Sequence, residues 1–216
     1  RIDSVPNSIT AGLDFNVIGQ VIDDDDATRV LIESVKLKAN WLNNANETLV
    51  ESYVTTNNGS FNISVPTDTS NNGTLRGAKT LVISVVDGSS KFYLTSSVES
   101  AIFVFGVTQF DSIQPLNAIV VNRGDDVNMT SQLVESSNLF QPLSGYDVTY
   151  QFRGSQIGTV QTDGRGFANI THNIPFSQPL GITTVDVIFA GSSDLLATSA
   201  NFSTINVRSL TFLIID

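Results

Sequence analysis

The 216-residue sequence contains no cysteine, and it has only one histidine, one tryptophan and one methionine. Without cysteine the chain has no disulfide, no thiolate metal ligand and no cysteine nucleophile. Packing and hydrogen bonding alone must therefore hold the fold together. Secreted animal domains of this size often carry a disulfide, so its absence favours a prokaryotic source, bacterial or archaeal.

Charge is also scarce, because charged residues make up 15% of the chain against 41% hydrophobic residues. The formal net charge is −10, and acidic residues outnumber basic ones on both sides of residue 105. An evenly acidic chain without a lysine or arginine cluster repels phosphate backbones and anionic lipids. Binding of nucleic acid or of a membrane surface is therefore not expected.

Long apolar runs are missing as well. The longest, Ala101–Val107 and Leu210–Ile215, have the length of strands and fall short of the roughly 20 residues that span a bilayer. We therefore expect no direct membrane insertion by this chain. The opening Arg1-Ile2-Asp3 is not a signal peptide, and we expect a leader and an anchor to lie outside this fragment.

Catalytic motifs are not evident. A Ser-His-Asp site is possible only around His172, which we interpret as an exposed histidine at the end of a strand. Neither a nucleophile elbow nor a phosphate-binding glycine loop occurs, and the glutamates other than Glu135 lie in no known motif: Glu33, Glu47, Glu51 and Glu99. The sequence predicts a protein that is not an enzyme and needs no cofactor.

One acidic run, Asp23-Asp24-Asp25-Asp26, concentrates the carboxylate ligands that Ca²⁺ prefers. Four further aspartates near the expected domain ends could add to such a site: Asp3, Asp111, Asp125 and Asp126. The run lacks the spacing that wraps one ion, and consecutive strand residues point to opposite faces. A solvated acidic loop is the alternative, and we prefer it to calcium binding.

Two further short patterns have simpler explanations. Arg123-Gly124-Asp125 matches an integrin-recognition tripeptide, but a glycine turn before a strand accounts for it. An internal lysine cross-link is excluded in the second half, which has no lysine, and Lys36 and Lys38 are expected to face solvent.

Asparagine-linked glycosylation is the modification that the sequence favours. Seven Asn-x-Ser/Thr acceptor sites occur, a modest excess over chance in so polar a chain: Asn46, Asn58, Asn62, Asn72, Asn128, Asn169 and Asn201. As a set they indicate a location outside the cell, with glycans attached at asparagine.

An internal repeat divides the chain near residue 108. Ile2-Asp3-Ser4-Val5 is echoed by Phe110-Asp111-Ser112-Ile113, and Gly59–Ser64 is echoed by Gly166–Thr171, with Asn62 matching Asn169. Asp87-Gly88-Ser89-Ser90 returns as Ala190-Gly191-Ser192-Ser193. We therefore predict two homologous domains, residues 1–107 and 108–216.

Short runs of alternating apolar and polar residues, separated by glycine, asparagine or proline clusters, predict antiparallel β-structure in both repeats. The expected strands are Leu13–Ile22, Val35–Leu42, Leu49–Thr55, Ser60–Val65, Thr80–Val86, Lys91–Thr95, Val98–Val104, Asp126–Leu133, Asp147–Arg153, Gly158–Gln161, Phe167–His172, Thr183–Phe189 and Phe202–Val207. Asp25–Lys36 is the one segment with a helical alternative; we favour an irregular crossover. Trp41, matched by Tyr150 or Phe152, is expected to be an ordinary core aromatic.

Three runs of the second repeat carry a family resemblance: Val148–Gly154, Thr162–Ala168 and Val187–Ser192. They resemble prokaryotic immunoglobulin-like repeats, whose shared features are a Thr-Asp-x-x-Gly-x-Ala turn and a strand end of Tyr or Phe, any residue, Gly, and Asp or Ser. The first repeat is similar to a more distant member. In the turn we expect Gly164 and Gly166 to adopt positive φ in a tight hairpin, and Asp163 to accept a backbone hydrogen bond.

These observations predict an all-β chain of two tandem immunoglobulin-like antiparallel β-sandwiches. The resemblance implies a structural module of a cell-surface protein, in a surface layer, filament or stalk, with neighbouring domains or other copies as partners. The alternative is an adhesin or carbohydrate-binding stalk. A third possibility is an accessory domain of a large extracellular enzyme.

The segment Leu210-Thr211-Phe212-Leu213-Ile214-Ile215 is more apolar than a solvated terminus should be. Its Ile-Asp ending resembles the start of both repeats, so we expect residues 210–216 to lead into a further repeat. Donation of this strand to a neighbouring subunit is the alternative; in both cases Leu210, Phe212, Leu213, Ile214 and Ile215 are assembly residues.

Overall fold

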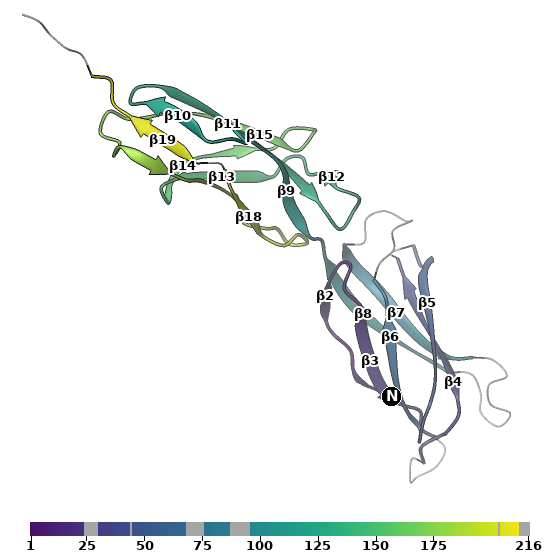
Figure 1. Cartoon of the computed structure of the whole chain (residues 1–216). Helices are drawn as coiled ribbons and strands as arrows, with labels where there is room; N and C mark the ends of the chain where they lie inside the picture. The colour runs from purple at the N-terminus through teal and green to yellow at the C-terminus, as the bar shows by residue number, and fades with distance from the viewer. Residues whose placement is uncertain (24–29, 44, 68–75, 87–95, 203, 212–216) are drawn as a thin grey trace, which may run out of the picture. The chain divides into compact units, whose positions relative to one another are not determined.

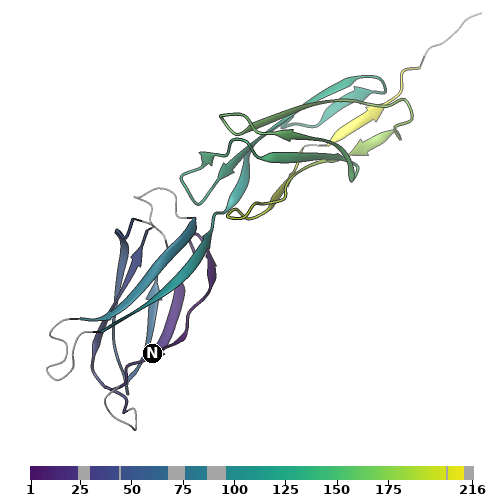
Figure 2. The ribbon, with the colours of Figure 1, turned by 180° about the vertical axis from the view of Figure 1, so that it is seen from behind.

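The computed structural model describes residues 1–23, 30–43, 45–67, 76–86, 96–202 and 204–211. The chain divides into two compact units, Arg1–Gly106 and Val107–Asp216, where the sequence placed the boundary after residue 107. Each unit is built of strands in two layers (Figure 1 and Figure 2). The described residues contain no helix that is long and apolar enough to cross a membrane.

Unit 1 consists of a three-stranded and a five-stranded sheet. Its strands are β1 Ile2–Ser4, β2 Ser8–Thr10, β3 Phe15–Gln20, β4 Lys36–Leu42, β5 Thr48–Thr55, β6 Ser60–Val65, β7 Gly77–Val85 and β8 Ser97–Phe105. One sheet has the order β1-β3-β6 and the other β2-β8-β7-β4-β5. All pairs are antiparallel except that of β2 with β8.

Unit 2 repeats this arrangement with some strands interrupted. Its strands are β9 Thr108–Gln114, β10 Ile119–Asn122, β11 Asp126–Glu135, β12 Gln141–Pro142, β13 Asp147–Phe152, β14 Ser155–Gln161, β15 Phe167–Asn173, β16 Gly181–Thr183, β17 Val185–Phe189, β18 Thr198–Asn201 and β19 Ile205–Arg208. In one layer β9 and β15 flank β11, and in the other the orders are β14-β13-β17-β18 and β10-β19-β16.

The two units therefore share one strand topology. β9, β11 and β15 correspond to β1, β3 and β6, and the broken pairs β16/β17 and β18/β19 take the places of β7 and β8. A short strand also runs parallel to the last strand in each unit, β2 beside β8 and β10 beside β19. Two sheets with inward-facing apolar residues confirm the prediction of two immunoglobulin-like β-sandwiches.

Each sandwich has its own apolar core, made by every second residue of its strands. In unit 1, Trp41 on β4 is fully buried and its ring lies 5.3 Å from that of Phe15. In unit 2, Tyr150 on β13 is fully buried 5.9 Å from the ring of Phe202. Phe152 is buried as well, so Trp41 and both of its expected counterparts are core aromatics.

Several local expectations were wrong. The turn at Thr162–Ala168 joins β14 to β15, which belong to different sheets, so it is a crossover and not a hairpin. Gly166 has a φ of 78°, but Gly164 does not adopt the left-handed conformation. Asp163 does accept the expected bond, from the backbone N–H of Arg165 at 2.8 Å, and a second from Phe167 at 2.9 Å.

The expected strand Lys91–Thr95 lies outside the described residues. Of the candidate helix Asp25–Lys36, the described part contains no helix, and Leu31 instead forms a β-bridge with Ile22. The strand that was expected at Phe202–Val207 begins only at Ile205, and β2, β10, β12 and β18 were not predicted.

The hydroxyl of Tyr150 gives a test of the core of unit 2. It donates to the carbonyl of Ala168 at 2.7 Å, so the 2.8 Å contact with Ser131 must use the serine hydroxyl as donor. Tyr150→Phe leaves two buried polar groups short of a partner, and we expect the free energy of unfolding to fall by about 1–3 kcal/mol. Urea titration followed by circular dichroism measures the change.

Thr149→Val is the matched control, because its hydroxyl bonds Thr159 at 3.0 Å on the exposed face of the same strand. We expect this change to cost less than about 1 kcal/mol. Fluorescence of Trp41, the only tryptophan, reports unit 1 as an internal reference. If both variants lower the free energy of unfolding equally, the buried hydroxyl of Tyr150 contributes no more than the exposed one of Thr149.

Candidate functional sites

The predicted glycosylation sites occupy two kinds of position, and all that are described are exposed: Asn46, Asn58, Asn62, Asn128, Asn169 and Asn201. Asn46 and Asn58 lie in tight turns, with φ of 60° and 50°. The other four lie on strands. Asn72 falls outside the described residues. All six side chains therefore reach solvent, and Nδ2 of Asn201 also donates to the Asp186 carboxylate at 2.7 Å.

Two of these sites, Asn128 on β11 and Asn169 on β15, meet across a strand pair. Asn128 lies opposite Thr171, and Asn169 lies opposite Thr130. Sequence reasoning did not find this arrangement, because the register of two strands forty residues apart is a property of the folded sheet. The matching Asn-x-Thr spacing in two strands of one sheet was the only signal.

The acidic run is only partly described. Asp23 donates its backbone N–H to the carbonyl of Val30, next to the bridge between Ile22 and Leu31. Asp24, Asp25 and Asp26 lie outside the described residues. Within the described ranges no three histidine or carboxylate side chains are grouped to hold a metal ion. Calcium binding by the run stays a prediction.

The Arg123-Gly124-Asp125 tripeptide forms a turn after β10. Gly124 has a φ of 91°, and the Asp125 carboxylate accepts from the backbone N–H of Asn122 at 2.7 Å. The Arg123 Nε–H donates to the carbonyl of Gln178 at 2.6 Å. Asp125 thus stabilises the turn itself, as a structural interpretation expects, and Arg123 ties the turn to the backbone at Gln178.

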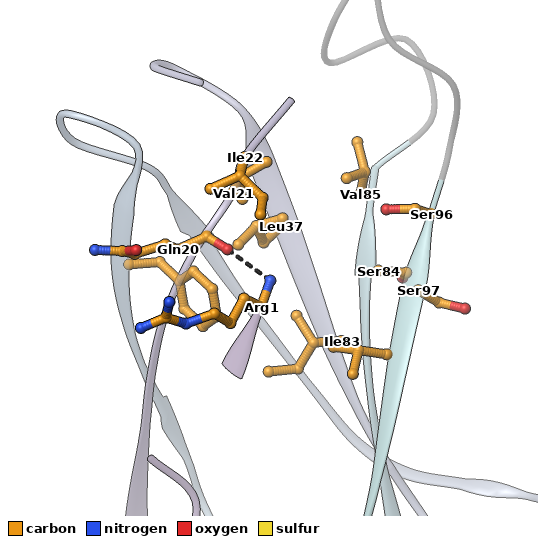
Figure 3. A pocket seen from close by; sticks show the side chains of 12 residues that line it. Arg1, Gln20, Val21, Ile22, Leu37, Ile83, Ser84, Val85, Ser96 and Ser97 are labelled. Carbon is orange, nitrogen blue, oxygen red and sulfur yellow. Dashed lines mark hydrogen bonds between the residues drawn. The ribbon is translucent and has the colours of Figure 1, made fainter. Parts of the chain in front are cut away.

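A cavity of about 320 Å³ opens between the sheets at one end of unit 1. Figure 3 shows the side chains around it, with the terminal ammonium of Arg1 donating to the Gln20 carbonyl at 2.8 Å. Apolar side chains dominate the wall: Val21, Ile22, Leu37, Phe61, Ile83, Val85 and Val98. Among these lining residues only Arg1 is ionisable, so the cavity offers no acid–base pair.

A charged cluster covers part of the outer face of β4 and β5. The Lys38 ammonium lies 2.5 Å from the Glu51 carboxylate, and the Tyr53 hydroxyl donates to the same carboxylate at 2.9 Å. The bond from Lys38 lowers the pKa of Glu51, and the bond to Glu51 raises the pKa of Lys38 and that of Tyr53. Lys36 sits 4.9 Å above the half-exposed Tyr53 ring.

Two basic side chains, His172 and Lys79, are half-buried or buried. His172 is not a freely exposed strand end; it is half-buried, with its ring 5.3 Å from that of Phe152, and burial lowers its pKa. Lys79, which sequence reasoning overlooked, points into unit 1 beside Leu81 on β7. Its Nζ donates to the Arg76 carbonyl at 3.1 Å, and burial lowers its pKa too.

The predicted assembly segment begins at Leu210, of which 63% is exposed. Phe212, Leu213, Ile214 and Ile215 lie outside the described residues. The role of this segment in assembly stays a prediction.

No family model and no curated protein matches the sequence. Among solved structures, the fibronectin(III)-like modules of CbhA from Clostridium thermocellum are 16% identical over 100% of this chain and 98% of theirs, with a TM-score of 0.37. A three-domain titin fragment is 10% identical over 97% of this chain and 65% of its own, with a TM-score of 0.46. A bacterial ice-binding adhesin is 15% identical over 93% of this chain and 61% of its own, with a TM-score of 0.32.

These likenesses are too distant to bear on activity or partners. The immunoglobulin-like assignment rests on the strand order and register of the two units.

His172 gives a pH test, since it is the only histidine. Burial places its folded-state pKa below the ordinary histidine value of about 6.5, so the unfolded chain takes up the proton first. We expect the stability of unit 2 to fall as the pH drops below about 6.5 through the lowered pKa. His172→Phe, which keeps an aromatic ring against Phe152, should flatten this dependence.

Urea midpoints measured between about pH 7.5 and 5.5 check the expectation, because aspartate and glutamate titrate mostly below that range. Parallel curves for the two proteins would mean that the pKa of His172 does not change on folding.

Proposed function

We propose that the chain is a non-enzymatic structural module of an extracellular surface protein of prokaryotic origin, within a surface layer, filament or stalk. The observation that carries the proposal is that one strand topology occurs twice, each time around its own apolar core. Repetition of a self-contained unit extends a protein without adding chemistry.

The use of polar side chains supports the same function. On the outer faces they bond one another across strands, as Thr149 does with Thr159 and Asn201 with Asp186. Among the described residues, His172 packs on Phe152 and Glu51 is paired with Lys38, and neither lines the cavity of unit 1. The cross-strand polar pairs on the outer faces stabilise the surface of each sheet.

Exposed acceptor asparagines support a location outside the cell. All six that are described can reach solvent, and glycans there would cover a surface that has few charges to solvate it. The proposed partners are neighbouring domains or copies of the same protein, together with the attached glycans. Neither nucleic acid nor a cofactor has a place in this proposal.

The cell envelope of the source organism provides the direct test. Antibodies against the purified chain, detected in electron tomograms of intact cells, should decorate the outer surface in a lattice, along filaments or on stalks. Recovery of the protein from the cytosol, without glycans, would contradict the proposal.

We further propose that Leu210–Ile215 joins units through main-chain pairing with a sheet edge. Removal of all residues after Ser209 leaves β19 complete, since that strand ends at Arg208. If the segment is donated to another subunit, the truncated chain should remain monomeric where the full chain assembles, as measured by light scattering and electron microscopy.

Leu213→Asp with Ile215→Asp in the full chain is the companion variant, because it keeps the length and removes the apolar character. Assembly of either variant into filaments like those of the full chain would rule out strand donation.

The alternative, a carbohydrate-binding adhesin, is supported by Tyr53. Tyr53 is half-exposed beside Glu51 and Lys38, and small-molecule sites commonly combine aromatic side chains with a few polar groups. If this surface binds a glycan, an array of glycans should give hits that Tyr53→Ala abolishes and Thr55→Ala, on the same face of β5, retains. An array without hits would remove this alternative.

A further inference from the structure

The acceptor sequences Asn128-Met129-Thr130 on β11 and Asn169-Ile170-Thr171 on β15 form a reciprocal pair. The antiparallel register sets the asparagine of each opposite the threonine of the other. The Thr130 hydroxyl donates to Oδ1 of Asn169 at 2.6 Å, and the Thr171 hydroxyl donates to Oδ1 of Asn128 at 2.7 Å. Each threonine therefore completes its own acceptor sequence and holds the amide of the opposite one.

The hydrogen bonds use one end of each amide. Oδ1 of Asn128 and of Asn169 accepts from a threonine, whereas Nδ2 of neither has a partner in the described part of the chain. Glycans attach at Nδ2 and leave the carbonyl oxygen free to accept a hydrogen bond. Both asparagines are exposed. The folded sheet can thus carry a glycan at each position with the two bonds intact.

We propose that Asn128 and Asn169 are a coupled pair of N-glycan attachment sites, in which Thr130 and Thr171 are positioning residues for the opposite amide. The proposal rests on the proposed extracellular location. In the reaction the bond between C1 of a phosphate-activated glycosyl donor and its phosphate oxygen breaks, and a bond from C1 to Nδ2 forms. The phosphate leaves with the electron pair, and Nδ2 loses one proton.

The strand pairing also sets when the reaction can occur. Thr130 pairs with Gln114 of β9 on one side and with Asn169 on the other, so the backbone around Asn128 is engaged within the sheet. A transferase has to grip the acceptor backbone, and it can do so here only before β11 and β15 pair. Asn46 and Asn58, in turns, stay accessible after folding.

Unit 1 contains a natural comparison for this pair. On β3 and β6, Asn16 lies opposite Ser64 and Ile18 lies opposite Asn62. Here Ile18 stands where unit 2 has Thr130, so Asn16 is not an acceptor and Asn62 has no facing hydroxyl. Unit 1 thus has one half of the pair, and Ile18→Thr would supply the other.

The first experiment measures occupancy of each asparagine. The full chain is secreted from a cell that N-glycosylates, its glycans are removed enzymatically in ¹⁸O-labelled water, and the labelled sites are read by mass spectrometry. We expect Asn128 and Asn169 to be occupied in the same molecules, and Ile18→Thr to add Asn16. Glycans at Asn46 and Asn58 with none at Asn128 and Asn169 would overturn the pair and leave the proposed function standing.

The same acceptors are then tested after folding. The unglycosylated chain, made in a bacterium without a glycosylation system, is given to a purified oligosaccharyltransferase with its lipid-linked donor. We expect Asn128 and Asn169 to be modified in the urea-unfolded chain and at least about tenfold less in the folded one, since opening of a paired strand costs more than about 1.4 kcal/mol. Equal modification of the folded and the unfolded chain would contradict the inference that the glycans attach before β11 and β15 pair.

A matched pair of variants tests the positioning role. Thr130→Val and Asn128→Gln both abolish the glycan at Asn128 and keep the one at Asn169. They differ at Asn169, because only Thr130→Val removes the hydroxyl that bonds its Oδ1. We expect the heteronuclear NOE of the glycan-linked Nδ2–H of Asn169 to fall in Thr130→Val, and to stay at the wild-type value in Asn128→Gln.

Thr130→Ser keeps both the acceptor sequence and the hydroxyl, so it should restore the glycan at Asn128 and the rigid amide at Asn169. If Thr130→Val and Asn128→Gln give the same NOE at Asn169, the threonine does not position the amide. The strand pair would then be an ordinary polar ladder, like the neighbouring bond from Asn173 Nδ2 to Asp126 Oδ1 at 2.8 Å.

Discussion

The alternation of side chains between the two faces of a strand is the constraint on which the rest of this structure depends. With no cysteine in the chain, cohesion comes from the inner faces, where Val17, Ile63 and Leu81 in unit 1 are almost completely buried. The residues between them are thereby forced outward. On β11 and β15, that outward set includes the asparagines and threonines that bond one another. The same alternation along each strand therefore determines both the apolar core and the polar outer face.

Strong alternation made the central strands predictable. Ser60–Val65 was predicted with its observed bounds, because Phe61, Ile63 and Val65 alternate with polar residues. Short strands at the sheet edges, such as Ser8–Thr10, escaped prediction because their residues are only partly buried. The membership of a strand in one sheet or the other depends on distant partners. For this reason the turn at Asp163 was mistaken for a hairpin although its hydrogen bond was foreseen.

The candidate sites follow the same division. Acceptor asparagines are visible as three-residue patterns, so their positions could be predicted, but the pairing of Asn128 with Thr171 could not. Lys79 was overlooked because a lysine is expected at the surface, although its place in the alternation with Leu81 and Ile83 indicated the interior.

The two cores differ in how the polar group of their central aromatic residue is hydrogen-bonded. Tyr150 satisfies its hydroxyl through Ser131 and Ala168, whereas Nε1 of Trp41 is buried without a hydrogen-bond partner among the described residues.

The parallel pairing of the early short strand with the last strand has a mechanical consequence. In unit 1, Ser8–Thr10 runs beside Phe103–Phe105, and in unit 2, Ile119–Asn122 runs beside Ile205–Arg208. When tension pulls a unit by its two ends, parallel strands near those ends slide past one another, so their hydrogen bonds carry the force together in shear. An antiparallel pair at the same place would open one bond at a time, like a zipper. Each unit is therefore clamped against extension along the chain.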